Sequence, residues 1–246
     1  KFEMTSTARA TDPTSLLKNL DRVFNGLNSK LEKSVREHLT AVYSTLAIGL
    51  VAASVGACAH LLTDMFRAGF LCSIVSVGLM FAIISSPAVR ENEKKRFGLF
   101  LAFSFFSGIS LGPLLEFAIA VDPSIISTAF FASVLIFGSF SLASLYAEST
   151  KYLFLGGSLM SASFTLLFIT LFGRWLIPVW FLLAFGLAIS CAFVLYDTQL
   201  IVEKNRRGDS DYVWHSIELF IDFLQIFRYI VTILSEKRDN DRRRKD

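Results

Sequence analysis

Long uncharged stretches recur along this chain at regular intervals. Two apolar stretches near its end, Trp180–Val202 and Val213–Leu234, also include acidic residues. At a helical rise of 1.5 Å per residue, about 20 residues cross the roughly 30 Å hydrocarbon core of a bilayer. The pattern predicts an all-α polytopic membrane protein with up to seven spans. The five earlier stretches reach this length and contain no Asp, Lys or Arg, and only one Glu: 39–62, 68–89, 97–121, 123–147 and 152–173.

The seventh stretch is the most polar one, because it contains Glu218, Asp222 and Arg228. Two arrangements fit this composition: a seven-helix bundle with the last helix shielded at its centre, or six spans plus a re-entrant segment. The third stretch contains Gly112-Pro113, which we expect to bend or break its helix and to free backbone carbonyls.

The composition supports a membrane protein and excludes several kinds of function. Of the 246 residues, 53% are hydrophobic and 25 are Phe, which is far more Phe than a soluble domain of this length carries. There is no glycine-rich phosphate loop and no paired-cysteine metal spacing. Cys58, Cys72 and Cys191 fall in apolar stretches, where we expect them to pack as small hydrophobes. We therefore expect no cofactor, no nucleic-acid partner and no enzymatic activity.

The distribution of Lys and Arg predicts the orientation in the membrane. Residues 1–38 contain seven of them, the 90–96 loop four and the 204–207 loop three. The N-terminus is therefore expected in the cytosol, with an amphipathic surface helix in residues 1–38 ahead of a transmembrane domain, 39–235. The basic tail, 236–246, also favours the cytosol, which conflicts with seven crossings. Lys1 is not a natural start, so Met4 is the expected initiator unless the chain is a fragment.

Acidic residues inside the last two stretches are the strongest functional signal. A charge at bilayer depth costs a few kcal/mol or more, so an intramembrane carboxylate indicates a functional site. Counted from the expected cytosolic boundary, Asp197 and Glu218 both lie about 9 Å deep and Asp222 about 15 Å deep. Depth therefore favours Glu218 as the partner of Asp197, although an error of a few residues in the boundaries leaves Asp222 open.

Two carboxyl groups that meet in a low-dielectric site share a proton, and when both are ionised they form a hard oxygen site suited to Ca²⁺. Asp197, together with Asp222 or Glu218, is therefore a candidate proton-sensitive gate and transient Ca²⁺ site. The alternative is that these acids only pair with Arg228 or stabilise helix ends. Glu218 and Glu116 are candidate supporting acids, and His215, near the membrane entrance, is a candidate pH modulator.

Four blocks of the sequence resemble one known family, the transmembrane Bax inhibitor motif proteins. The blocks are GISLGPLLEFAIAVDPSIISTAF, KYLFLGGSLMSA, FVLYDTQLIVEK and GDSDYVWHSIELFIDFLQIF, and the collinear similarity covers about residues 38–234. The similarity is greatest to members from the eukaryotic endoplasmic reticulum. The resemblance implies a seven-helix bundle and a pH-sensitive Ca²⁺ leak that suppresses programmed cell death. It also implies that the gating aspartates are Asp197 and Asp222, and it selects Asp222 over Glu218.

Three functions follow for testing. The first is a pH-sensitive Ca²⁺ leak channel or Ca²⁺/H⁺ exchanger of the endoplasmic-reticulum membrane, with lipid, Ca²⁺ and protons as partners. The alternative is a non-transporting membrane protein that inhibits cell death by binding Bcl-2-type regulators or reticulum stress sensors. An intramembrane aspartyl protease is disfavoured, because Asp222 follows Leu219-Phe220-Ile221 rather than a glycine-containing motif.

Overall fold

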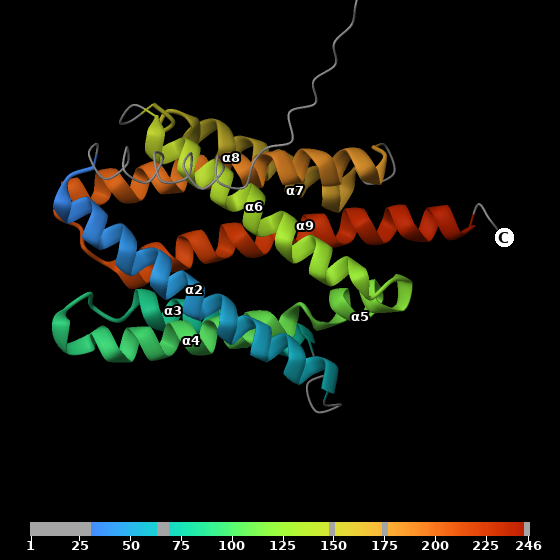
Figure 1. The fold of residues 1–246 in the computed structure, drawn as a ribbon, viewed down its shortest axis with the longest axis horizontal. Coiled ribbons are helices and arrows are strands. Elements are labelled where there is room, and N and C mark those ends of the chain that lie inside the picture. The colour runs from blue at the N-terminus through green and yellow to red at the C-terminus, as the bar shows by residue number, and fades with distance from the viewer. Residues whose placement is uncertain (1–30, 63–68, 148–150, 174–176, 244–246) are drawn as a thin grey trace, which may run out of the picture.

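The computed structural model describes residues 31–62, 69–147, 151–173 and 177–243, and the described chain is helical without strands (Figure 1). The predicted amphipathic helix in the N-terminal tail lies mostly outside these residues, and the boundary placed at residue 38 falls inside the first described helix. The helices are α2 (Lys33–Leu62), α3 (Gly69–Ile84), α4 (Glu93–Ser110), α5 (Gly112–Val121), α6 (Ser124–Tyr146), α7 (Leu155–Phe172), α8 (Val179–Arg206) and α9 (Tyr212–Arg243), with a single 3-10 turn, η2 (Arg90–Asn92), before α4.

The predicted helix break in the third apolar stretch is confirmed. Helix α4 ends at Ser110 and α5 begins at Gly112, with Pro113 in the first turn of α5. Proline is tolerated in the first turn of a helix, but its ring clashes with the backbone of any helical turn that precedes it. The two helices are bent by 40° relative to each other, a geometry that fits either one broken span or a re-entrant loop.

Length and hydropathy support a multi-pass membrane protein. Among the described helices, α2, α6, α7 and α8 are long and apolar enough to cross a bilayer, and the bent pair α4–α5 makes a fifth if it forms one span. Helix α3 is apolar but has only 16 residues, and α9 is more polar than the others. Seven crossings therefore depend on how α3 and α9 lie in the bundle.

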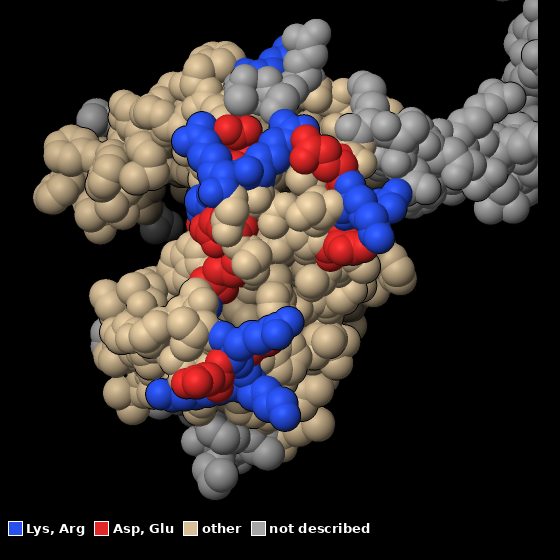
Figure 2. Space-filling model, turned by 90° about the vertical axis from the view of Figure 1, so that its left-hand side faces the viewer, with Lys and Arg blue, Asp and Glu red and all other residues tan. Residues whose placement is uncertain are grey.

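One end of the bundle is densely charged, and we call it the charged end: residues 32–37, 90–96 and 203–211. Figure 2 shows blue and red side chains interspersed on this face. Arg206 pairs with Glu32 across 3.6 Å, and Arg96 Nη2 lies 2.7 Å from Asp211 Oδ2. These ion pairs join the start of α2, the start of α4 and the α8–α9 connection, which the Lys and Arg pattern assigns to one side of the membrane.

Helix α9 runs from the charged end to the opposite end as one continuous helix. It has 32 residues, about 48 Å at helical rise. Near its C-terminus, Arg238 Nη1 lies 3.2 Å from Asp122 Oδ2, in the connection between α5 and α6. A continuous α9 fits the seven-helix arrangement, and residues 236–243 lie at the end opposite to the charged end.

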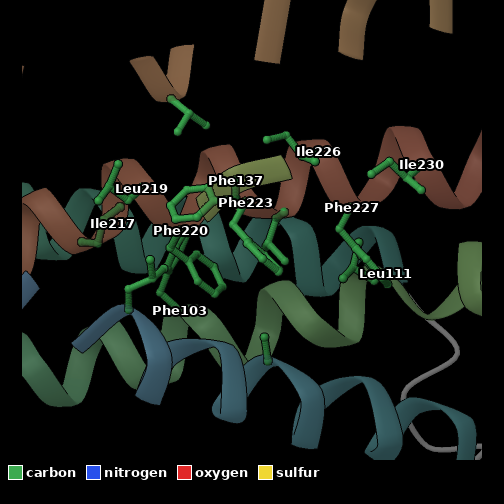
Figure 3. Packing of buried hydrophobic residues seen from close by; sticks show 14 of the residues in the cluster. Phe103, Leu111, Phe137, Ile217, Leu219, Phe220, Phe223, Ile226, Phe227 and Ile230 are labelled. Carbon is green, nitrogen blue, oxygen red and sulfur yellow. The ribbon is translucent and has the colours of Figure 1, made fainter. Parts of the chain in front are cut away.

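Helix α9 is central in the bundle, as the shielded-helix prediction requires. It packs against α2, α4, α5, α6 and α8, while α3 lies outside against α4 and α7 against α8. The buried ring of Phe220 meets Phe100 and Phe103 edge-on, with ring centroids 5.8 and 5.7 Å away. Phe223 packs likewise against Phe137 (Figure 3). This aromatic core, which α4, α6 and α9 supply, helps to shield the polar residues of α9 from lipid.

Candidate functional site: an acidic pair between helices α8 and α9

Asp197 on α8 and Asp222 on α9 meet in the interior of the bundle. Their carboxyl groups lie close enough to interact with each other directly. An ionised carboxylate only accepts hydrogen bonds, so a hydrogen bond between the two groups needs a proton on one of them. Asp222 is 7% exposed, and its Oδ2 atom has no hydrogen-bond partner among the described residues. That oxygen is a buried acceptor available to a proton, a water molecule or a cation.

The depth argument favoured Glu218 as the partner of Asp197, and the structure corrects this prediction. Side chains on a helix tilt toward its N-terminus. Because α8 and α9 run in opposite directions, Asp197 on α8 points deeper into the bundle, while Asp222 on α9 points back toward the charged end. The two carboxyl groups therefore meet, although their backbone positions differ in depth. Glu218 is directed away, toward the charged end.

Glu218 lies at the rim of the site and is bound by two donors. Lys204 Nζ and Trp214 Nε1 each donate a hydrogen bond to Glu218 Oε1, both over 2.8 Å. Glu218 and Lys204 also act electrostatically on Asp197, the first as a like charge and the second as an opposite one. The rim of the site thus carries one acidic residue, Glu218, and one basic residue, Lys204. The sequence pattern did not point to Lys204.

Glu116 is not brought to the acidic pair. It lies on α5, where His60 Nε2 of α2 is 3.1 Å from its Oε1 atom, and its side chain is 54% exposed. Gly112 permits this contact: a Cβ there would lie 2.0 Å from the His60 ring. Arg228 likewise bonds elsewhere, because its Nη2 donates to Ser110 Oγ on α4 over 3.3 Å.

His215 is fully buried rather than interfacial, and its partner is another histidine. His38 Nε2 on α2 lies 2.8 Å from His215 Nδ1, and Asp209 Oδ2 lies 3.7 Å from His215 Nε2. His38 was missed because it stands at the edge of the N-terminal tail, where no spacing motif links it to α9.

A chain of hydrogen-bonded polar side chains lies beside Asp197, and the sequence pattern did not predict it. Tyr43 on α2 hydrogen-bonds Ser141 on α6, and Ser141 Oγ lies 3.3 Å from Thr198 Oγ1, next to Asp197. On the same turn of α8, Gln199 Oε1 accepts the backbone N–H of Tyr152 over 2.6 Å. The only sequence signal was the run of polar residues Asp197-Thr198-Gln199 inside an apolar stretch. Among the described residues, no group of three or more His, Cys, Asp or Glu side chains is arranged to hold a metal ion.

The fold and site define a class: a polytopic helical membrane protein whose central helix carries a buried acid, Asp222. The chain belongs to the family described as "Inhibitor of apoptosis-promoting Bax1", whose model matches residues 35–239. This match confirms the family resemblance found in the sequence, and it spans all eight described helices apart from the first two residues of α2 and the last four of α9.

Proteins named Bax inhibitor 1 are similar over nearly the whole chain. The protein from Homo sapiens is 43% identical over 220 residues, covering 88% of this chain and 93% of its own length. The Bos taurus protein is 41% identical over 230 residues, covering 92% and 97%. The Drosophila melanogaster protein is 37% identical over 226 residues, covering 89% and 91%.

Proposed function

We propose that this protein is a pH-sensitive Ca²⁺ leak pathway of the endoplasmic-reticulum membrane and that it suppresses programmed cell death. The pathway is either a channel or a Ca²⁺/H⁺ exchanger. The observation that carries the proposal is that the carboxyl groups of Asp197 and Asp222 meet inside a membrane bundle. Membership in a family described as inhibiting apoptosis-promoting Bax1 supports the biological role. The charged end, with the N-terminus, faces the cytosol in this proposal, because it holds the basic loops.

The acid pair supplies the gate. With one shared proton, the two carboxyl groups bond and hold α8 against α9. When both are ionised, two negative charges in a low-dielectric site repel each other and favour either separation of the helices or capture of a cation. Ca²⁺ takes six to eight oxygen ligands, so the carboxylates would supply only part of its shell and water the rest. Ca²⁺ is here the transported ion, and the two aspartates are its transient ligands.

The direct test is Ca²⁺ flux from liposomes that contain the purified protein, measured from pH 5.5 to pH 8. Wild type is compared with Asp197→Asn and Asp222→Asn, which keep the side-chain shape but cannot ionise. We expect flux that titrates with pH in wild type and a flattened profile in both variants. Glu116→Gln is the matched control, because Glu116 is a membrane-embedded acid that bonds His60 instead, and it should keep the wild-type profile. If both Asn variants keep the wild-type flux and pH profile, the gate is wrong.

The interaction protein remains the second candidate, because the matching family is described by its action on another protein. Two surfaces are available for this: the charged end for cytosolic partners, and the helical tail 236–243, whose Arg242 and Arg243 are exposed, for partners on the opposite side of the membrane. Bcl-2-type regulators and reticulum stress sensors are the proposed partners. Deleting residues 236–246 separates the two functions: lost protection of cells with intact Ca²⁺ flux supports binding. Wild-type liposomes with no flux above empty liposomes at any pH would also favour it.

A further inference from the structure

Helices α2 and α6 both pack on α9 but hardly touch each other (Figure 1). Two cavities, of about 720 and 630 Å³, occupy the space between them. Leu50 of α2 and Phe223 of α9 line both cavities, so the two lie next to each other along the bundle. We call this pair of adjacent cavities the α2–α6 groove. Its floor is α9.

The chemistry of the α2–α6 groove changes along its length. Arg36, Thr40 and Ser44 line it toward the charged end, and apolar residues such as Leu46, Leu50 and Phe137 line the remainder. From Arg36 to Leu50 the groove follows α2 for about 21 Å. That exceeds half of the roughly 30 Å hydrocarbon thickness, so the groove reaches from the membrane surface past the midplane.

This gradient of polarity matches the long axis of a phospholipid in one leaflet. An apolar groove between two membrane-spanning helices opens to hydrocarbon, where water has no hydrogen-bond partners. A guanidinium at the membrane surface is the side chain best suited to a phosphate oxygen. We propose that the α2–α6 groove binds a membrane glycerophospholipid, with one acyl chain along Leu46, Leu50 and Phe137 and the phosphate beside Arg36.

A lipid in this groove would lie one layer from the acid pair. Phe223 in the floor directly follows Asp222, and the groove wall contains Tyr43 and Ser141, which connect to Thr198. The acyl chain would therefore close the lateral side of the bundle at the depth of the carboxyl groups. The binding proposal itself rests only on the membrane placement of α2 and α6 and not on ion transport.

Gly138 of α6 provides a clean way to fill the groove. It lines the cavity, and a Cβ at this position would meet no atom within 4 Å. Gly138→Leu therefore starts its side chain in open space and directs it into the groove. Gly157 of α7 has the same open surroundings but lies outside the groove, so Gly157→Leu is the matched control. Ser44→Phe fills the groove from α2 and serves as a second blocking variant if Gly138→Leu fails to fold.

The experiment uses the full chain in phosphatidylcholine vesicles doped with phosphatidylcholine that carries a photoreactive diazirine on one acyl chain. After illumination, labelled peptides are mapped by mass spectrometry. The face of α7 at Phe164 and Phe168, which are 65% and 64% exposed, serves as the reference for ordinary boundary lipid. We expect label on α2 and α6 groove residues in excess of α7, and loss of that excess in Gly138→Leu and Ser44→Phe but not in Gly157→Leu. Arg36→Gln should also reduce it.

Two results would overturn the proposal. Groove residues labelled no more than Phe164 and Phe168 would show that only boundary lipid contacts this face. Excess label that persists in both blocking variants would place the lipid elsewhere. Because labelling is read without Ca²⁺ flux, either result leaves the proposed ion pathway to its own test.

Discussion

The imidazole of His38 on α2 lies 2.8 Å from that of His215 on α9, measured between Nε2 and Nδ1, in the interior near the charged end. One of the two nitrogens must donate the proton and the other accept it. His38 is 8% exposed and His215 fully buried, so neither ring can exchange this bond for water without opening the bundle. The pair therefore fastens the first described helix to the central one.

Removing either histidine should destabilise the protein because the other ring is left without its buried partner. We expect a loss of about 1–3 kcal/mol for His38→Ala or His215→Ala. The double variant should lose less than the sum of the two. Thermal unfolding of the detergent-purified protein measures all three. The control is His60→Ala, which removes the α2 histidine that contacts Glu116, and its loss of stability should add to that of His215→Ala. If the losses of His38→Ala and His215→Ala were additive instead, the two rings would not interact energetically.

Lys204 should tune the proposed gate. It acts on Asp197 as a nearby positive charge and bonds Glu218 directly. Without this charge, the acids hold their protons more readily, so Lys204→Met should shift the pH profile of Ca²⁺ flux to higher pH. Lys204→Arg should keep the wild-type profile. Arg207→Met removes an exposed cation on the same helix end, one that pairs with Glu203, and should shift nothing; an equal shift there would point to general surface charge.

Helices α2 and α4 should tolerate no side chain at Gly108. A Cβ there would lie 1.9 Å from the Ala53 carbonyl oxygen and 2.7 Å from its carbon, both backbone atoms that cannot rotate away. Small residues permit such close backbone approach between membrane helices. We expect Gly108→Ala to cost about 1–3 kcal/mol. Gly98→Ala on the same helix meets open space and should be neutral or stabilise by up to about 1 kcal/mol. Equal unfolding temperatures would contradict the close contact.

The end of α9 should loosen in acid. Hydrogen bonds from Ser124, reinforced by Arg238 and Arg242, hold the pKa of Asp122 below its usual range. A carboxyl group with a depressed folded pKa contributes stability above its unfolded pKa, near 4, and this is lost as pH falls through the folded value. At neutral pH, Asp122→Ala should therefore speed hydrogen exchange in residues 236–243.

The control for this exchange experiment is Asp241→Ala, which removes another acid from the same tail. After correction for intrinsic exchange rates, residues 236–243 of the wild type at acidic pH should exchange about as fast as those of the Asp122→Ala variant. The exchange rate of the Asp122→Ala variant itself should not change further on acidification. A tail that exchanges equally in wild type and in Asp122→Ala at neutral pH would mean that the Arg238 contact does not hold it.

The sequence determined which segments are helices, because uncharged stretches of bilayer length leave the backbone no other way to satisfy its hydrogen bonds in lipid. It also determined the break at Gly112-Pro113, since proline acts through local sterics. The candidate acids were visible for the same kind of reason: a charged residue stands out in an apolar stretch. The family resemblance, rather than any physical argument from the residues, selected Asp222.

Only the tertiary structure decided which of these residues meet. Depth along a helix favoured Glu218, but the antiparallel packing of α8 and α9 tilts Asp197 and Asp222 toward each other and Glu218 toward Lys204. The His38–His215 pair and the α2–α6 groove join segments distant in the chain, and no local pattern specifies them. Helical periodicity fixes the face on which a side chain lies. Its partner depends on which helices pack together and in which direction they run, and this is decided by the whole bundle.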